Sequence, residues 1–338
     1  MASTTNHQWR LVSRPSGRLE PTNFEWVELP VPEPGDDEVL VRVVHLSLDP
    51  TYRGWAARDT YVPAVALGSV MRGFAVGIVE ASRSASFARG DLVQGMLGWQ
   101  EWAAVPARGL ARVSLPPGLP LDGALGLFGH IGATAYFGLV DVARPRQGET
   151  LVVTGAAGAV GSLVGQIGKI LGLEVVGIAG SDEKCAWLVD DLGFDGAVNY
   201  KTESVRARLG ELCPGGIDVH FENVGGDLLD IALSMINLRA RIVLCGLIAQ
   251  YNERLPPPGP RMLGNLLVKR ARMEGFIVLD YVSRFAEANQ ALAGWWAEGR
   301  LKYRTDVVRG LEHAPEALNR LFDGTHRGKL IVEVSDTP

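Results

Sequence analysis

The strongest pattern of apolar and polar positions lies in residues 149–180 and predicts a strand, a turn, a helix and a second strand. Residues 151–153 form a short apolar run that is typical of a buried parallel strand. Residues 162–171 are apolar at helical spacing, and residues 174–178 form a second apolar run. Three glycines separate the first strand from the helix: Gly155, Gly158 and Gly161. This order predicts a βαβ unit with a glycine turn.

The glycine turn suits a bound dinucleotide. Glycines let the chain turn tightly, let the backbone approach a pyrophosphate, and let helix and strand pack closely. The helix that follows offers free N–H groups and a favourable dipole to phosphate. The spacing is a variant of the usual fingerprint, because Ala157 stands where its second glycine would be. The alternative interpretation is a tight turn in an unrelated α/β protein, but the flanking strands and helix favour a nucleotide site.

The chain before this unit has a different pattern. Apolar and polar residues alternate over 9–12 and 24–29, as they do in half-buried strands. Further short strands are expected at 38–44, 72–80, 90–95 and 99–103. Short strands separated by frequent turn residues predict an all-β, barrel-like first domain.

Strands and helices alternate from residue 149 to about residue 250, which predicts a parallel sheet covered by helices. Within this region residues 228–237 are expected to form a helix and residues 241–246 a strand. The chain returns to β character after residue 301, and its last strand, 328–334, is expected to rejoin the first domain. The predicted fold class is therefore α/β, with a doubly wound Rossmann sheet and a β-barrel domain.

Composition narrows the functional classes. The 338 residues fit two domains, and 47% hydrophobic with 21% charged residues are globular values. A net charge of −5 offers no basic surface for nucleic acid. No uninterrupted apolar run reaches about 18 residues, so we expect no membrane span, and the N-terminus lacks an apolar signal core. Three distant cysteines form neither a disulfide framework nor a metal-knuckle spacing, so the cytoplasm is the expected location.

The end of the second strand indicates which nicotinamide cofactor is used. An acidic residue at that position hydrogen-bonds the ribose hydroxyls of NAD, whereas this chain has Ala179-Gly180-Ser181 there. Lys184, one turn into the next helix, can offer its ammonium group to a 2′-phosphate. Tyr200 is a candidate for the adenine side. A solvated helix face for Lys184 and a half-buried core position for Tyr200 are the alternatives, and the pattern as a whole favours NADPH.

These residues resemble the zinc-free branch of the medium-chain dehydrogenase/reductase superfamily. That branch includes leukotriene hydroxydehydrogenases, prostaglandin reductases and alkenal double-bond reductases. The resemblance runs from about residue 8 to the C-terminus. It is carried by segments 47–54, 70–73, 132–139, 156–162, 179–184, 221–226, 245–252 and 274–276.

The resemblance implies a domain division and a set of cofactor-binding positions. A GroES-like catalytic domain is expected over 1–124 and 304–338, and a Rossmann NADPH-binding domain over 125–303. The expected cofactor-binding residues are Thr134, Ala157, Gly158, Ala159, Val160, Gly180, Lys184, Tyr200, Asn223, Cys245, Tyr251, Phe276, Ile277, Val278 and His326. A homodimer is also implied by the resemblance alone.

Two positions depart from the family pattern. His326 stands where the family often has an asparagine, so the contact normally made there is open. The early Asp-Pro-Tyr-Met-Arg-Gly motif reads Asp-Pro-Thr-Tyr-Arg-Gly here, which moves its tyrosine to position 52.

No metal is expected. Zinc enzymes of the superfamily carry a cysteine near residues 46–54 and Gly-His-Glu near 67–71, and this chain has neither. Its six histidines show no metal-ligand spacing. Without a Lewis acid to stabilise an alkoxide, reduction of a polarised C=C bond fits better than alcohol oxidation.

The resulting hypothesis is an NADPH-dependent reductase that delivers hydride to the β-carbon of an α,β-unsaturated ketone or aldehyde. A neutral donor must stabilise the enolate oxygen, and a proton must reach the α-carbon. Tyr251 ranks first for these roles, then Tyr61, then Tyr52. For each tyrosine a packing role is the alternative, and solvent or the cofactor ribose hydroxyl is another proton source. A quinone reductase and a non-catalytic NADPH-binding protein are the competing functions.

Overall fold

The computed structural model describes residues 4–255 and 257–336. The chain divides into two compact units. Unit 1 comprises Met1–Leu125 and Thr305–Pro338, and unit 2 comprises Gly126–Arg304. The boundaries expected from the sequence differ from these by one residue at each crossing.

Unit 1 contains a seven-stranded sheet with the order β14-β15-β3-β4-β5-β7, in which β6 also pairs with β3. Its strands are β3 Glu38–Ser47, β4 Ala75–Ser82, β5 Leu92–Gly95, β6 Trp102–Pro106, β7 Leu110–Arg112, β14 Thr305–Arg309 and β15 Lys329–Glu333. Apolar side chains from these strands and from 121–125 form its core. The helices of this unit are α1 Thr51–Ala57 and α10 Ala314–Asp323, and α2 Gly123–Gly126 lies at its boundary.

The C-terminal segment is part of the unit 1 sheet, as the sequence predicts. β15 runs antiparallel to β3, with Ile331 opposite Ser47, and β14 runs parallel to β15 on the other side. A buried ion pair holds β15 in place, because Lys329 Nζ lies 2.7 Å from Asp49 Oδ1 and 2.8 Å from the carbonyl oxygen of Leu48. Burial lowers the pKa of Lys329, although the carboxylate of Asp49 opposes that shift.

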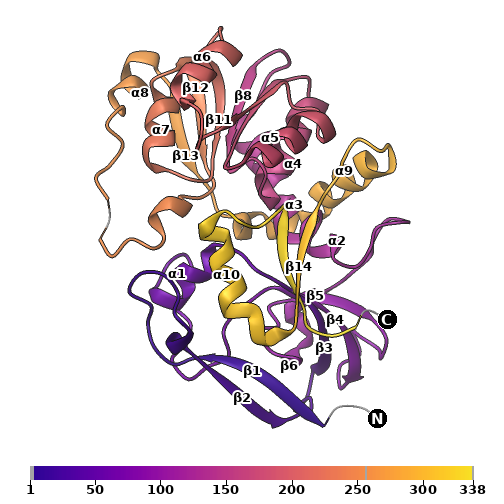
Figure 1. The fold of residues 1–338 in the computed structure, drawn as a ribbon. Coiled ribbons are helices and arrows are strands. Elements are labelled where there is room, and N and C mark those ends of the chain that lie inside the picture. Colours follow the sequence, from indigo (N-terminus) through magenta and orange to yellow (C-terminus); the bar gives the residue numbers. More distant parts are fainter. Residues whose placement is uncertain (1–3, 256, 337–338) are drawn as a thin grey trace. The chain divides into compact units, whose positions relative to one another are not determined.

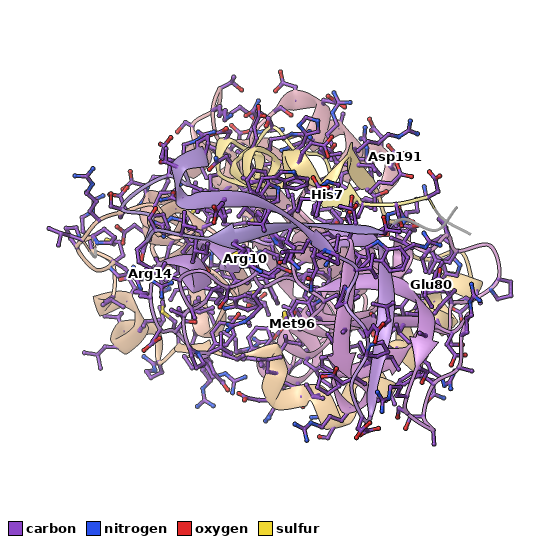
Figure 2. All side chains as sticks on the ribbon, turned by 90° about the horizontal axis from the view of Figure 1, so that it is seen from below. His7, Arg10, Arg14, Glu80, Met96 and Asp191 are labelled. Carbon is purple, nitrogen blue, oxygen red and sulfur yellow. The ribbon has the colours of Figure 1, made fainter. Side chains whose placement is uncertain are left out.

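A separate two-stranded ribbon also belongs to unit 1. β1 Thr5–Leu11 and β2 Phe24–Pro30 pair antiparallel, with Trp9 opposite Trp26. His7 stacks on Trp26 with ring centroids 5.1 Å apart; Figure 2 labels His7 and Arg10 on β1.

Unit 2 is a six-stranded parallel sheet with the order β10-β9-β8-β11-β12-β13. The strands are β8 Thr150–Thr154, β9 Glu174–Ala179, β10 Gly196–Asn199, β11 Ile217–Glu222, β12 Ile236–Leu244 and β13 Arg272–Gly275. The strand order reverses between β8 and β11, which is the doubly wound Rossmann arrangement predicted from the sequence. Ligands bind outside the carboxyl ends of the strands at such a reversal.

Helices precede, connect and follow the strands of unit 2 (Figure 1). They are α3 Gly129–Phe137, α4 Ala159–Ile170, α5 Asp182–Ala186, α6 Val205–Leu212, α7 Gly226–Leu233, α8 Gly264–Lys269 and α9 Phe285–Ala297. All five residues of β8 are buried. That burial explains why its central residues, 151–153, form an uninterrupted apolar run rather than an alternating one.

The helix predicted over 228–237 is too long. α7 ends at Leu233, and β12 already begins at Ile236, which pairs with Ile217 of β11. Ile236 is buried with Leu229 and Leu233. The apolar residues at helical spacing therefore run on into a buried strand, and periodicity alone could not separate the two.

Within the described residues, one helical stretch, Gly123–Ala143, is long and apolar enough to cross a membrane by length and composition. However, 78% of its most apolar window is buried inside the protein. Its apolar composition is therefore explained by its burial in the protein core.

Candidate functional site

The glycine turn between β8 and α4 has the backbone expected of a phosphate-binding turn. Gly155 has φ +59°, a left-handed conformation that favours glycine. A Cβ on Gly161 would lie 2.4 Å from the carbonyl oxygen of Gly155, so only glycine lets the helix start this close to the turn. Gly158 is the N-cap of α4 and has no side-chain cap. The first N–H groups of this helix have no partner within the helix and point towards the turn, as a pyrophosphate site requires.

The end of β9 shows the features expected for the adenosine half of a dinucleotide. The ring of Tyr200 lies over Gly180, where a Cβ would be 3.0 Å from it, and Tyr200 is 44% exposed. Ser181 caps α5 by accepting the backbone N–H of Lys184 at 3.3 Å. Lys184 thus sits on the first turn of α5, and its side chain is partly exposed. Positions 180 and 181 are glycine and serine, so neither carries a carboxylate that would repel a 2′-phosphate.

A buried carboxylate, not identified from the sequence, lies where the strand order reverses. Glu222 ends β11 and is fully buried. Its Oε1 accepts hydrogen bonds from Thr154 Oγ1 at 2.6 Å and from the N–H groups of Val224 and Gly225 at 2.6 and 2.9 Å. Its Oε2 lies 2.8 Å from Nε2 of His220.

The donors around Glu222 keep it ionised. Burial by itself would raise the pKa of Glu222, but hydrogen bonds from His220 and Thr154 outweigh it, so the pKa lies below its usual value. The other ring nitrogen of His220, Nδ1, is buried without a hydrogen-bond partner. Because the ionised carboxylate can only accept, Nε2 of His220 carries a proton and donates it to Oε2.

Asn223 is fixed by the same network. Its backbone N–H donates to Thr154 Oγ1 at 2.8 Å, and its Nδ2 donates to the Thr154 carbonyl oxygen at 2.7 Å. Asn223 is partly exposed, although its amide nitrogen is committed to the end of β8.

The turn after β12 is joined to Glu222 through the backbone. The N–H groups of Cys245 and Gly246 donate to the carbonyl oxygen of Glu222 at 3.0 and 3.1 Å. Burial, followed by the charge of Glu222, raises the pKa of the Cys245 thiol to about 12. Cys245 is therefore a neutral thiol at physiological pH and not a nucleophile.

Tyr251 lies beside this turn. Its hydroxyl accepts the backbone N–H of Leu247 at 3.3 Å and lies 3.3 Å from the point that a Cβ on Gly246 would occupy. The side chain is partly exposed. The structure thus brings Tyr251, Cys245 and Asn223 to the carboxyl ends of β11 and β12.

The remaining expected cofactor residues of unit 2 have mixed surroundings. Phe276, Ile277 and Val278 follow β13 and are half-buried, and Val278 packs against a cluster that includes Phe137. Thr134 Oγ1 donates to the carbonyl oxygen of His130 at 2.6 Å within its own helix.

Two of the predicted tyrosines belong to unit 1 and differ in exposure. Tyr61 is 46% exposed, and its hydroxyl lies 2.9 Å from Thr51 Oγ1. Tyr52 is fully buried, and its hydroxyl accepts the backbone N–H of Phe74 at 2.8 Å. Burial and the nearby charge of Asp49 raise the pKa of Tyr52 well above its usual value. The enclosed hydroxyl of Tyr52 therefore holds the backbone of Phe74, whereas the hydroxyl of Tyr61 belongs to an exposed side chain.

His326 also belongs to unit 1. Its Nδ1 lies 3.2 Å from the carbonyl oxygen of Arg320 and is oriented to donate to it. The histidine that replaces the family asparagine therefore contacts the end of α10.

Among residues 4–255 and 257–336, no group of three or more His, Cys, Asp or Glu side chains is placed to hold a metal ion.

Comparison with protein-family models identifies the class of protein to which the chain is similar. Residues 7–113 match a family described as the N-terminal domain of oxidoreductase, and residues 159–294 match one described as zinc-binding dehydrogenase. The two matches fall in unit 1 and unit 2 respectively.

Individual relatives match nearly the whole chain. The chain is 40% identical to the NADPH-dependent curcumin reductase of Escherichia coli, over 98% of this chain and 97% of that protein. It is 42% identical to the NADP(+)-dependent 2-alkenal reductase of Nicotiana tabacum, over 91% and 90% of the two chains. The crystal structure of CurA from Vibrio vulnificus in complex with NADPH superimposes with a TM-score of 0.92 and 42% identity, covering 98% of this chain and 100% of that one.

The chain belongs to the zinc-free branch of the medium-chain dehydrogenase/reductase superfamily, as its motifs predict.

Proposed function

We propose that the protein is an NADPH-dependent reductase of the C=C bond of α,β-unsaturated ketones and aldehydes. The observation that carries this proposal is the edge formed by β8, β9 and β11. The glycine turn there leaves the first N–H groups of α4 without partners in the helix. The neighbouring strand β9 is followed by Gly180 and Ser181, neither of which is acidic, and then by Lys184 on α5. Relatives of known specificity support the choice of substrate, because they include a curcumin reductase and a 2-alkenal reductase that use NADP(H).

The residues of this chain fit the bound group. Gly158 and the first N–H groups of α4 would hold the pyrophosphate, and Lys184 would hold the 2′-phosphate. When bound, NADPH would supply the hydride that adds to the β-carbon of the substrate. Tyr200 lies on the same side as Lys184, so its exposed ring is available to the adenine.

The chemistry left to the protein is the handling of charge and a proton. Negative charge develops on the carbonyl oxygen as the β-carbon is reduced, and a fixed hydrogen-bond donor lowers the barrier. Tyr251 is our first candidate for that donor, because its hydroxyl is held beside the turn after β12. Tyr61, which is exposed and paired with Thr51, is the second. The proton for the α-carbon then comes from one of these hydroxyls or from solvent.

A coupled assay tests the function. Purified protein is mixed with NADPH or NADH and with a panel of medium-chain enals, enones and benzoquinones, and loss of the reduced cofactor is followed. We expect turnover of enals and enones with a preference for NADPH. A preference for quinones would favour a quinone reductase, and tight NADPH binding without turnover of any compound would favour a non-catalytic binding protein.

We also propose a cytoplasmic homodimer. β13 is an edge strand of the unit 2 sheet, and Leu267 and Val268 on the neighbouring α8 are 82% and 63% exposed. Exposed edges and apolar patches of this kind are often covered by a partner. Light scattering should give twice the chain mass of 36.4 kDa, and Leu267→Glu should shift it towards one chain.

A further inference from the structure

We infer that Glu222 is a positioning residue for the nicotinamide half of the cofactor. The inference rests on the proposed function, because it assumes that NADPH binds at this edge of the sheet, with its two nucleotides at different halves of the edge. The adenosine half would lie over β9, where Gly180 and Lys184 are found. The second half of a doubly wound sheet takes the other nucleotide, and Glu222 lies at the start of that half.

The side chain of Glu222 joins two strand ends and the loop between them. Its carboxylate accepts from Thr154 at the end of β8 and from Val224 and Gly225 after β11. Thr154 in turn accepts the backbone N–H of Asn223 and the amide nitrogen of its side chain. Removing the carboxylate would therefore release the loop that presents Asn223.

The backbone of Glu222 controls a third element. Its carbonyl oxygen accepts the N–H groups of Cys245 and Gly246, which begin the turn beside Tyr251. One residue thus fixes the loops after β11 and β12, both of which face the proposed nicotinamide position. Glu222 itself is fully buried, so we infer that its influence on the cofactor passes through those loops.

The network requires an acceptor at both carboxylate oxygens. Three donors point at Oε1 and the Nε2 proton of His220 points at Oε2. A glutamine has the same shape, but its NH2 group would replace one of the two acceptor oxygens and would then point at a group that also donates. His220 can relieve this conflict only by moving its proton to Nδ1, which has no hydrogen-bond partner. Glu222→Gln therefore disturbs the network locally and leaves the packing unchanged.

The test separates the two halves of the cofactor. Dissociation constants are measured by calorimetry for NADPH and for 2′,5′-ADP, which carries only the adenosine half, with wild type and Glu222→Gln. We expect the substitution to weaken NADPH about tenfold and to leave 2′,5′-ADP unchanged. Turnover of an enone at saturating NADPH should fall as well, because the ring is held less firmly.

Glu149→Gln is the matched control. Glu149 belongs to an ion pair with Arg241 on β12 of the same sheet, outside the cofactor residues named above. It should lower the unfolding temperature without changing either dissociation constant. Thr154→Val, which removes the hydroxyl between Glu222 and Asn223, should show the selective loss of NADPH affinity even if Glu222→Gln folds poorly.

Each other outcome overturns the inference. Equal weakening of NADPH and 2′,5′-ADP would mean that Glu222 supports the fold generally, and no weakening would mean that the loops hold their shape without it. If wild type binds neither ligand, the proposed function fails first, and this result is distinguished by the wild-type titrations alone.

Discussion

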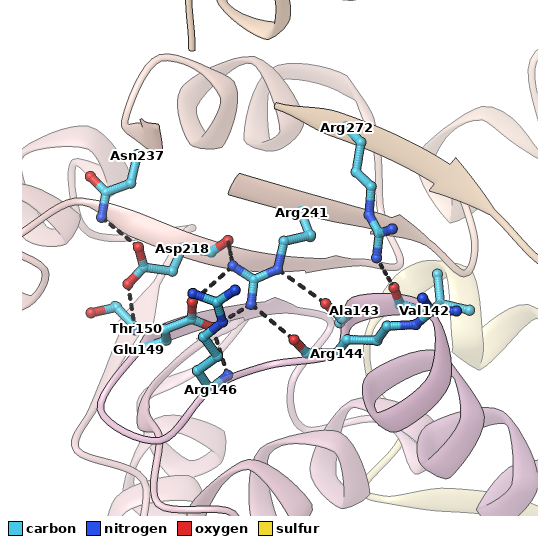
Figure 3. A network of polar contacts seen from close by, with 10 residues as sticks. All are labelled: Val142, Ala143, Arg144, Arg146, Glu149, Thr150, Asp218, Asn237, Arg241 and Arg272. Carbon is cyan, nitrogen blue, oxygen red and sulfur yellow. Dashed lines mark hydrogen bonds and ion pairs between the residues drawn. The ribbon is translucent and has the colours of Figure 1, made fainter. Parts of the chain in front are cut away.

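The two ends of the unit 2 sheet each hold a glutamate, and the partners of the two glutamates differ. At the carboxyl ends of the strands, Glu222 is surrounded by a histidine, a hydroxyl and loop N–H groups. Near the amino end of β8, Glu149 forms two contacts with the guanidinium of Arg241, one of them at 3.0 Å (Figure 3). The first carboxylate organises loops, and the second holds a cation.

The cluster around Arg241 (Figure 3) fastens chain segments to the sheet. Arg241 also donates to the carbonyl oxygens of Ala143 and Arg144, at 3.0 and 3.4 Å. Nearby, Asp218 accepts from the backbone of Thr150 at 2.9 Å. Burial alone would raise the pKa of Glu149, but the hydrogen bonds from Arg241 and from the Arg146 backbone, together with the charges of both arginines, outweigh it, so the pKa lies below its usual value. Both carboxylates are ionised, so their charge does not distinguish them. What marks the functional edge is that Glu222 orders loops, whereas Glu149 binds an arginine.

The largest effect is expected from Tyr251→Phe, which tests the carboxyl edge. Loss of one donor to a developing oxyanion lowers kcat by about 100-fold or more. The unfolding temperature should stay near that of wild type, because the hydrogen bond that this hydroxyl accepts from the Leu247 N–H is long, at 3.3 Å. Steady-state assays with an enone and NADPH measure this. Unchanged kcat would remove Tyr251 from the mechanism and make Tyr61→Phe the next variant.

Arg241→Ala should do the reverse at the amino edge. It leaves Glu149 without its cation, so the free energy of unfolding should fall by about 2 kcal/mol. Urea titration measures this fall, and the kcat of the variant for an enone should match that of wild type at a temperature where both are folded. A large loss of kcat in the folded variant would show that the two edges are coupled and would break the comparison.

Lys184→Ala sharpens the comparison within the carboxyl edge. We expect KM for NADPH to rise about tenfold, equivalent to about 1.4 kcal/mol, because a charge-assisted contact to the 2′-phosphate is lost. KM for NADH, which lacks that phosphate, should not change. Lys169→Ala is the control, because Lys169 pairs with Asp195 instead. Equal changes in KM for the two cofactors would contradict the assignment.

The smallest effect is expected in the dependence of stability on pH. Glu222 and Glu149 both have a pKa below the unfolded value near 4.5. A depressed pKa contributes stability that is fully present above the unfolded pKa and is lost as pH falls through the folded pKa. The stability difference between wild type and either glutamine variant should therefore shrink below about pH 4.5. A difference that grows on acidification would show that the carboxylate is protonated in the folded protein.

The sequence predicted the order of elements better than their ends. The βαβ unit was readable because apolar strands, three glycines and an amphipathic helix fall in one order, and α4 begins at Ala159 as the glycine turn requires. The helix expected over 228–237 overran into β12, because buried helix and buried strand share apolar residues.

The sequence could predict only those parts of the site whose residues lie close together along the chain. The glycine turn follows the first strand of one βαβ unit and Lys184 follows its second strand, so their neighbourhood follows from the chain. Glu222 was missed as an individual residue because its partners come from β8 and from loops after β11. One signal was available: a histidine and a glutamate stand two apart in a strand whose other positions are largely apolar. The burial of Tyr52 was not readable from the sequence, because a shift of one residue along α1 directs a side chain to a different face.

The insertion of β15 between β14 and β3 has a consequence for synthesis on the ribosome. All of unit 2 precedes β15 in the chain, so the Rossmann sheet can close while β3 still lacks β15. Until translation reaches Lys329, the partner of buried Asp49 is missing and the end of β3 at 45–47 stays unpaired on the side that β15 later covers. A stop codon placed just before β15 should therefore yield an intact nucleotide-binding unit attached to an aggregation-prone first unit.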